Sequence, residues 1–328
     1  MVFPSGEQFE IAAGGYRAVV TESGAALRTL SYADRPLVDG FAADEMSPGG
    51  RGQLLMPWPN RVRDGKFSFG GRDLQLALTE PKRSNASHGL ARWAAWTLEE
   101  HTPNSVSLVL RVMAQTGYPW AVDLHVLYDL SADGLTVTQT ATNLSGEAAP
   151  YACGAHPYLS VGAARNGAID DLELTLPAGT RVLTDDRLIP TETVPVDEEH
   201  DFRTGRAIGA VQLNEAYGDL VRVDGIATTT LRDPRDGHGV ALWVDDKIPW
   251  LLLYSADDVP GKERRSLAVE PMTAPADAFN SGVDLVTLAP AGSPGDELSV
   301  TWGIRALPAE WLSVPAAAGG PPSAARPG

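Results

Sequence analysis

Four short stretches of the sequence place an ionisable or amide side chain beside glycine, proline or aromatic residues, where a regular strand would not have it. They are "LLMPWPNRVRDGKF", "SNASHGLARWAAW", "CGAHPYLSVG" and "AVEPMTAPADAFNSG". His156 and Glu270 each precede a proline, which disfavours helical backbone and keeps the residue extended. We therefore expect both side chains to project from the ends of strands.

A histidine and a glutamate that face each other across a pocket make a proton donor and acceptor pair, since modest pKa shifts bring both groups near neutral pH. Arg61 and His88, from the first two stretches, could then orient a polyhydroxylated ligand. Taken singly, such residues are more often a solvated glutamate, a core histidine or a surface arginine. The functional interpretation depends on the four stretches occurring together.

Short strands joined by tight turns must position these side chains. Hairpin turns are predicted at 70–71, at 133–134 and around 233–239, each between runs of strand character. Residues 122–130 alternate in character, with one apolar face and one polar face, as in a half-buried antiparallel strand. Long segments of helical period are absent. The sequence therefore predicts an all-β fold, a large antiparallel sandwich or closed sheet system.

The chain shows no repeat of fixed period and no strong linker. We expect one domain over residues 1–306. Residues 307–328 end in "PAAAGGPPSAARPG", which is rich in proline, alanine and glycine, and we expect a disordered tail there.

Composition excludes several classes of partner. The 328 residues are 43% hydrophobic and carry a formal net charge of -16, which argues against nucleic acid or an anionic membrane surface as a partner. A small neutral substrate is compatible with this charge. The single cysteine, Cys153, allows no intrachain disulfide, and the N-terminal residues lack the pattern of a signal peptide. We expect a cytoplasmic protein, a monomer or homodimer.

The order "PNR...G.F", "HG...R.W", "HPY" and "EP.T...DAFNSG" resembles the aldose 1-epimerase, or galactose mutarotase-like, family from about Gly24 to Arg305. The resemblance implies a β supersandwich and a mutarotase that interconverts the α and β anomers of an aldose. It implies Glu270 as the general base and His156 as the general acid, with no metal, nucleotide or redox cofactor. General acid–base catalysis also implies a bell-shaped dependence of rate on pH.

The resemblance further implies that Asn60, Arg61 and His88 orient the sugar. Trp58 and Tyr158 lie beside the motifs and could line the pocket.

Two positions depart from the family's pattern. Asn214 stands where members usually have an aspartate that contacts sugar hydroxyls, although Asp219 lies close by and could be that carboxylate. Leu252 stands where many members have a glutamine. Both departures leave the identity of the sugar open.

Two other functions remain as alternatives. A glycoside hydrolase or lyase is one, although hydrolysis usually needs two carboxylates and only Glu270 has a motif around it. A non-catalytic sugar-binding protein is the other. The remaining histidines show no zinc-like spacing and are interpreted as surface or structural residues, and Cys153 as a small buried thiol.

Overall fold

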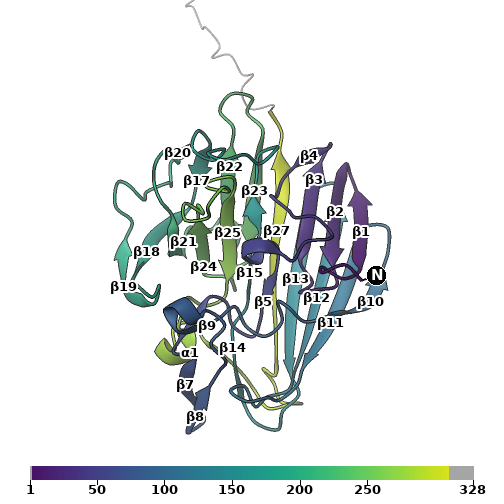
Figure 1. The fold of residues 1–328 in the computed structure, drawn as a ribbon, viewed down its shortest axis with the longest axis vertical. Helices are drawn as coiled ribbons and strands as arrows, with labels where there is room; N and C mark the ends of the chain where they lie inside the picture. The colour runs from purple at the N-terminus through teal and green to yellow at the C-terminus, as the bar shows by residue number, and fades with distance from the viewer. Residues whose placement is uncertain (1, 310–328) are drawn as a thin grey trace, which may run out of the picture.

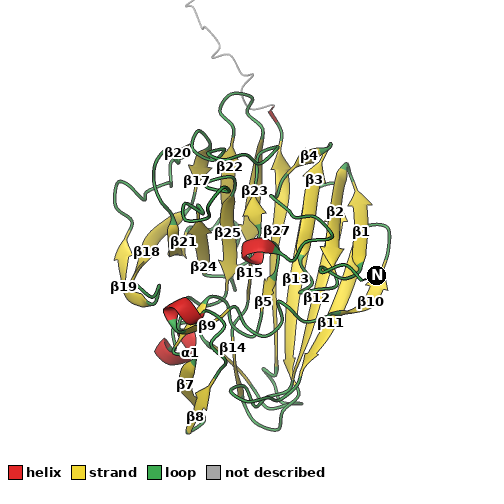
Figure 2. Ribbon diagram, viewed as in Figure 1, coloured by secondary structure: helices red, strands yellow, loops and turns green. Residues whose placement is uncertain are grey.

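The computed structural model describes residues 2–309, and antiparallel strands form almost all of their regular structure (Figures 1 and 2). Two large sheets, of nine and eight strands, dominate the molecule. The one α-helix of the described residues is the single turn α1 (Ala278–Ser281). Short 3-10 turns occur at Pro48–Gly50 and Pro81–Arg83. The predicted all-β architecture is confirmed.

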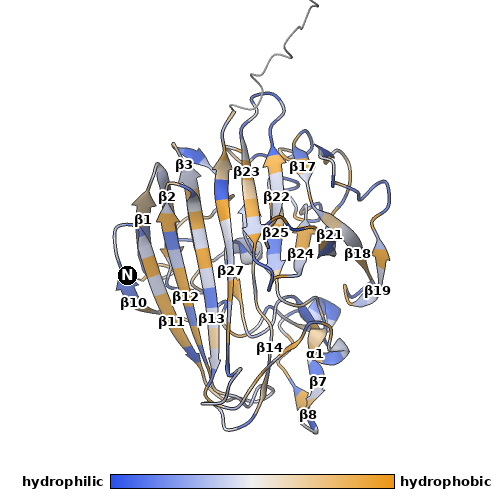
Figure 3. Cartoon of the chain, turned by 180° about the vertical axis from the view of Figure 1, so that it is seen from behind, coloured by the Kyte–Doolittle hydropathy of each residue, from blue (hydrophilic) through white to orange (hydrophobic). Residues whose placement is uncertain are grey.

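The nine-stranded sheet contains the longest strands. In sheet order these are β10 (Thr97–His101), β11 (Ser105–Val112), β12 (Val122–Ser131), β13 (Gly134–Asn143), β27 (Glu297–Leu307), β23 (Gly239–Val244), β22 (Ala227–Arg232), β17 (Glu173–Thr175) and β20 (Arg206–Ala207). The apolar face predicted for 122–130 is buried at every second residue of β12. Apolar and polar bands follow one another along these strands in Figure 3, so one face covers the core.

The eight-stranded sheet carries the candidate site. In sheet order it contains β19 (Pro190–Pro195), β18 (Ala178–Thr184), β21 (Asn214–Leu220), β24 (Trp250–Tyr254), β25 (Leu267–Met272), β15 (Gly154–Ala155) and β5 (Leu54–Leu55), with β16 (Tyr158–Leu159) also paired to β25.

Smaller sheets complete the fold. One has four strands in the order β1 (Gln8–Ala13), β2 (Tyr16–Thr21), β3 (Leu27–Tyr32) and β4 (Arg35–Pro36). Three have two strands each: β14 (Ala149–Tyr151) with β26 (Val286–Leu288), β6 (Arg61–Arg63) with β9 (Asn85–Ser87), and β7 (Lys66–Phe69) with β8 (Arg72–Gln75).

The three predicted hairpins are present. They are β7–β8, β12–β13 and β22–β23, and their strands pair antiparallel up to the predicted turns. The last strand runs to Leu307, one residue beyond the predicted end of the domain. The rest of the predicted tail, from residue 310 on, lies outside the described residues.

A buried polar side chain links the two large sheets. Gln139 of β13 is 2% exposed, and its amide donates to the Gly154 carbonyl of β15 (3.1 Å) and accepts from the indole N–H of Trp302 in β27 (3.0 Å). Gly154 lies two residues before His156, so this link helps to hold the backbone on which the candidate site depends. Buried polar groups must be paired in this way, because leaving one unpaired costs about 1–3 kcal/mol.

We expect Gln139→Leu to lower the free energy of unfolding by about 2–4 kcal/mol, because it leaves the Gly154 carbonyl and the Trp302 N–H unpaired in the interior. Urea unfolding followed by fluorescence measures this. Thr138→Val, on the opposite face of the same strand, is the matched control and should stay within about 0.5 kcal/mol of the parent. Equal stabilities for the two variants would show that the hydrogen bonds of Gln139 do not stabilise the fold.

Candidate active site

Glu270 lies on the face of β25 that points away from the main core. All six residues of β25 are buried, but they divide between two faces. Leu267 and Val269 pack into the main hydrophobic core, whereas Met272 belongs to a separate cluster on the opposite face. Glu270 shares the face of Met272 because side chains of a strand alternate. The sequence therefore buries this carboxylate by pattern, at 2% exposure.

His156 meets this carboxylate from the segment between β15 and β16. Both strands pair with β25, which brings the histidine beside the glutamate. The Nε2 atom of His156 lies 3.2 Å from Oε1 of Glu270. Within residues 2–309, the His156 Nδ1 atom and the Glu270 Oε2 atom are buried without a hydrogen-bond partner. Unpaired buried polar atoms are costly, so a ligand that offers hydroxyl groups would find partners here.

Packing fixes the plane of the His156 ring. The ring of Tyr158 stacks on it with 5.0 Å between centroids and 11° between planes. The guanidinium of Arg51 lies over the Tyr158 ring, 4.2 Å from its centre, and pairs with the buried Asp39 at 3.1 Å. Gly50, at φ +78°, leaves room for the imidazole, since a Cβ atom there would lie 3.1 Å from His156 Cδ2.

Burial changes the proton affinity of both groups. It raises the pKa of Glu270 to about 8, an effect that the nearby Arg61 partly opposes. It lowers the pKa of His156 to about 3, and the positive charges of Arg51, Arg92 and Arg61 act in the same direction. Both shifts favour the uncharged form, because a low-dielectric site disfavours charge. Between these two values the pair holds one proton, which the short contact allows to sit on either partner.

Two hydrogen bonds join His88 and Asn60, one between their backbones and one from the Asn60 backbone to the His88 ring. The amide N–H of His88 donates to the Asn60 carbonyl (2.8 Å), and the amide N–H of Asn60 donates to Nδ1 of His88 (3.2 Å). Because Nδ1 accepts, the neutral ring carries its proton on Nε2. Burial keeps the ring neutral by lowering its pKa well below the usual value. The ring meets that of His156 edge-on at 5.5 Å, so its Nε2–H is a donor beside the pair of His156 and Glu270.

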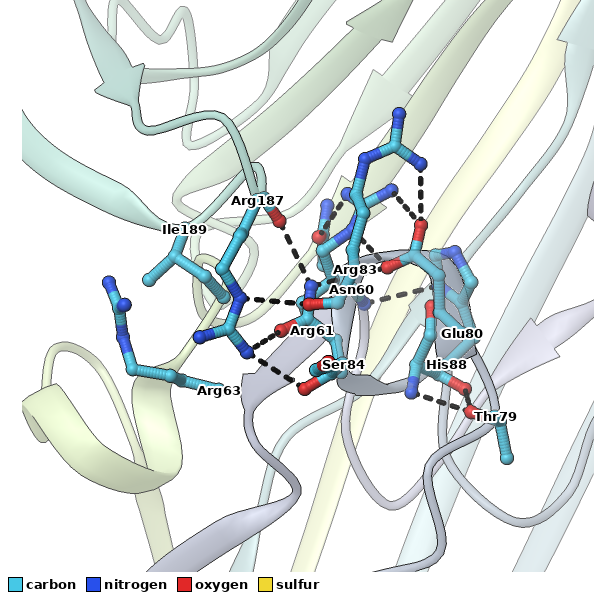
Figure 4. A network of polar contacts seen from close by, with 12 residues as sticks. Asn60, Arg61, Arg63, Thr79, Glu80, Arg83, Ser84, His88, Arg187 and Ile189 are labelled. Atoms are coloured by element: carbon cyan, nitrogen blue, oxygen red, sulfur yellow. Dashed lines mark hydrogen bonds and ion pairs between the residues drawn. The ribbon is translucent and has the colours of Figure 1, made fainter.

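Arg61 is held by a residue that the sequence analysis did not single out. Glu80 accepts from its Nε (2.8 Å) and Nη2 (3.1 Å) in a bidentate pair, and Arg61 Nη1 donates to the Asn60 amide oxygen (3.0 Å). Arg83 adds a further bond to Glu80 at 2.9 Å (Figure 4). Burial raises the pKa of Glu80, but these bonds outweigh it and lower the pKa overall. The signal was available, since Glu80 precedes Pro81 just as Glu270 precedes Pro271.

These side chains surround a cavity of about 410 Å³. Seven of the eight site residues predicted from the sequence line it, together with Leu252, the cross-strand neighbour of Glu270. The seven are Asn60, Arg61, His88, His156, Tyr158, Asn214 and Glu270. The sequence analysis missed Arg51, Tyr254, Asp258 and Lys262, which also line it. These four come from loops and strand ends without a motif.

The structure distinguishes Asn214 from Asp219 as the residue at the site. Asn214 lines the cavity from the start of β21. Asp219 does not: it is exposed, adopts φ +52° near the other end of the strand and packs beside Gly179. Trp58 was also expected to line the pocket, but it is 3% exposed and packs on Phe279 in the interior, 5.6 Å between ring centres.

Other features of the described residues do not form a second candidate active site. A larger hollow of about 620 Å³ adjoins the cavity through Pro48, Arg51 and Lys262, but its lining contains no histidine. Within residues 2–309 no group of three or more metal-ligating side chains is placed to hold an ion. The same residues include no helix with the length and apolar character of a bilayer span. Cys153 is the buried thiol that was predicted, and burial raises its pKa to about 12.

The pKa shift of Glu270 predicts a pH-dependent cost in stability. Above pH 4.5 the unfolded chain ionises this carboxyl while the folded chain keeps it protonated up to about pH 8, so the cost grows as pH rises through this window. Glu270→Gln removes the titrating group. We expect the melting temperature of the variant minus that of the parent, measured by differential scanning calorimetry, to be larger at pH 8 than at pH 6.5.

The control is Glu100→Gln, which replaces an exposed glutamate of β10 and should leave the melting temperature unchanged. A constant difference between Glu270→Gln and the parent over this pH range would show that burial does not shift the Glu270 pKa.

Comparison with known proteins bears on the fold and the family of this chain. The sequence is 33% identical over 286 residues to the uncharacterized protein YihR of Escherichia coli K12, covering 87% of this chain and 89% of that one. It is 27% identical over 209 residues to human galactose mutarotase, covering 59% and 60% of the two chains. The fold matches a Caenorhabditis elegans GalM/aldose epimerase homologue with a TM-score of 0.81 at 21% identity, over 92% and 98% of the chains. Residues 7–300 match the model of the aldose 1-epimerase family, and the chain therefore belongs to that family.

Proposed function

We propose that this protein is a cofactor-independent mutarotase that interconverts the α and β anomers of an aldose. The observation that carries the proposal is the buried contact of 3.2 Å between His156 and Glu270 in a cavity of about 410 Å³, a volume suited to one small ligand. Around the pair stand donors suited to hydroxyl groups, namely Arg61, His88 and Asn60. Family membership supports the same reaction class.

Ring opening requires one proton to leave the anomeric hydroxyl and another to reach the ring oxygen. Glu270 takes the first proton and His156 supplies the second, so that the bond between C1 and the ring oxygen breaks and an aldehyde forms. Rotation about the bond between C1 and C2 presents the other face of the aldehyde. Reclosure then runs with both transfers reversed, His156 taking the proton from the hydroxyl and Glu270 returning one to the carbonyl oxygen.

One proton on the pair suffices for this cycle. At rest the proton is on Glu270, because its pKa lies above that of His156. Its transfer to His156 across the 3.2 Å contact gives the ionised base and the charged acid that opening requires, and after opening the proton is again on Glu270. The total is the same in both states. The shifted pKa values, about 8 for Glu270 and about 3 for His156, keep the pair in its one-proton form over the physiological range. Burial thereby supplies the correct proton count, while Arg61 beside Glu270 favours the ionised form needed for opening.

Three measurements separate the alternatives. A hydrolase needs a second carboxylate, and Asp258, which accepts a hydrogen bond from Tyr254, also lines the cavity. Polarimetry of a freshly dissolved α-aldose detects mutarotation, whereas chromatography of a glycoside detects cleavage. Accelerated mutarotation supports the proposal. Cleavage of the glycoside supports a hydrolase, and saturable binding with neither activity supports a sugar-binding protein.

Replacing either member of the pair should remove most of the activity. We expect Glu270→Gln and His156→Asn each to lower kcat by about 10² to 10⁴, since neither amide can exchange the proton. Sugar binding by calorimetry should survive in Glu270→Gln, which keeps the side-chain shape. His125→Asn changes a histidine outside the cavity, beside Glu99, and is the control expected to retain full activity. Near-parental kcat in Glu270→Gln would remove that residue from the mechanism.

The activity should depend on pH with widely separated limbs. Above about pH 8 the pair loses its single proton and no acid remains to open the ring, and below about pH 3 a second proton occupies the base. We therefore expect kcat/KM, corrected for the spontaneous rate, to be level from pH 5 to 7.5 and to fall above about pH 8. A catalysed rate that continues to rise through pH 9 would contradict this proton count.

A further inference from the structure

The turn between β18 and β19 carries a leucine where glycine is the usual residue. The amide N–H of Asp185 donates to the Ile189 carbonyl (2.9 Å), which leaves a hairpin loop of three residues, 186–188. The Leu188 N–H donates to the Asp185 carbonyl (2.8 Å), and Leu188 adopts φ +58°. Such loops normally end in glycine, because the left-handed conformation brings the Cβ atom of any other residue too close to the backbone.

Leu188 stands out among the residues with positive φ in the described part of the chain. The others, glycines aside, are mostly aspartate, asparagine or alanine, and Leu188 is the one aliphatic residue larger than alanine. A bulky residue persists in this conformation only where the surrounding structure enforces it, and such positions concentrate at functional sites. The leucine therefore needs a reason beyond the turn itself.

Packing against the core does not supply this reason. Leu188 is half-buried, but over residues 2–309 it belongs to none of the hydrophobic clusters and is not among the partly buried side chains that pack against them. It lies instead between the cavity and a small recess of about 20 Å³, since it lines both. The other residues that line both spaces are Asn60, Arg61, Asn214 and Leu252.

Anchoring of the turn does not supply the reason either, because Arg187 performs it. The Arg187 guanidinium donates to the backbone carbonyls of Arg83 (2.8 Å) and Ser84 (2.8 Å) and to the Asp64 carboxylate (2.8 Å) (Figure 4). The Asn85 amide donates in return to the Arg187 carbonyl (2.9 Å). These bonds fix the turn against the segment that precedes His88 without using the Leu188 side chain.

We propose that Leu188 is a substrate contact, whose side chain packs on the C–H surface of the bound aldose, and that the strained position is retained for this contact. This inference rests on the proposed function. A sugar ring presents C–H groups between its hydroxyls, and burying them against a leucine favours binding. Asn60 and His88, at φ +53° and +61°, also line the cavity, so left-handed residues gather around the ligand space.

The experiment compares Leu188→Ala, Leu188→Gly and Leu188→Met with the parent in polarimetric mutarotation of galactose and of glucose. Both truncations remove the contact, so we expect KM to rise about three- to tenfold while kcat stays within about twofold of the parent. Leu188→Met keeps an apolar side chain of similar volume and should hold KM within about twofold.

The melting temperature supplies a readout that separates strain from packing. Glycine relieves the left-handed strain and alanine keeps it, so Leu188→Gly should melt about 1–3 °C above Leu188→Ala although both have the raised KM. Ala33→Gly is the control, because Ala33 has φ +46° at an exposed turn and does not line the cavity. It should melt slightly above the parent with an unchanged KM.

A KM that neither truncation changes, in a parent protein that accelerates mutarotation, would overturn the inference and leave the mutarotase intact. Equal melting temperatures of Leu188→Gly and Leu188→Ala would also count against it, because the leucine would then not be held in a strained position. Absence of acceleration for both sugars in the parent would overturn the proposed function itself, and the inference with it.

Discussion

The proposed chemistry depends on the joint burial of one histidine and one glutamate. Alone, either group would be expensive to bury; as a pair 3.2 Å apart they can share one proton and remain neutral overall. Burial pushes the two pKa values apart, and this separation gives the pair a single proton over several pH units. A solvated pair would lose the proton count on which the proposed cycle depends. Burial of the pair therefore lowers the stability of the fold but fixes the protonation state of the site.

The rest of the structure serves to hold this pair. The register of β24, β25, β15 and β16 brings His156 beside Glu270, and the stacked Tyr158 ring sets the plane of the imidazole. Two arginines at the cavity are paired with carboxylates: Arg51 with Asp39, and Arg61 with Glu80. These pairs hold both guanidinium groups in place as hydrogen-bond donors. Gln139 extends the support into the second sheet, so that the active-site backbone is tied to the core behind it.

Much of the architecture could be predicted from the sequence, because alternation and turn residues are local signals. The three hairpins and the buried face of β12 follow from them directly. The motif residues around Asn60, His88, His156 and Glu270 could also be predicted, since each interrupts a regular pattern. Contacts between distant segments could not. Nothing local indicates that Glu80 pairs with Arg61, or that Arg51 lies over Tyr158, because those partners depend on the tertiary fold.

The choice between Asn214 and Asp219 shows the same limit. Both lie in β21, and spacing alone did not decide between them; the pairing of Asn214 with Tyr254, whose ring lines the cavity, places it at the site. The most direct measurement of the central claim is a ¹⁵N NMR titration of the His156 ring. The account predicts that this ring stays neutral well below pH 6 and shifts only near pH 8, when Glu270 loses its proton. A His156 that titrates near pH 6.5, as in water, would contradict it.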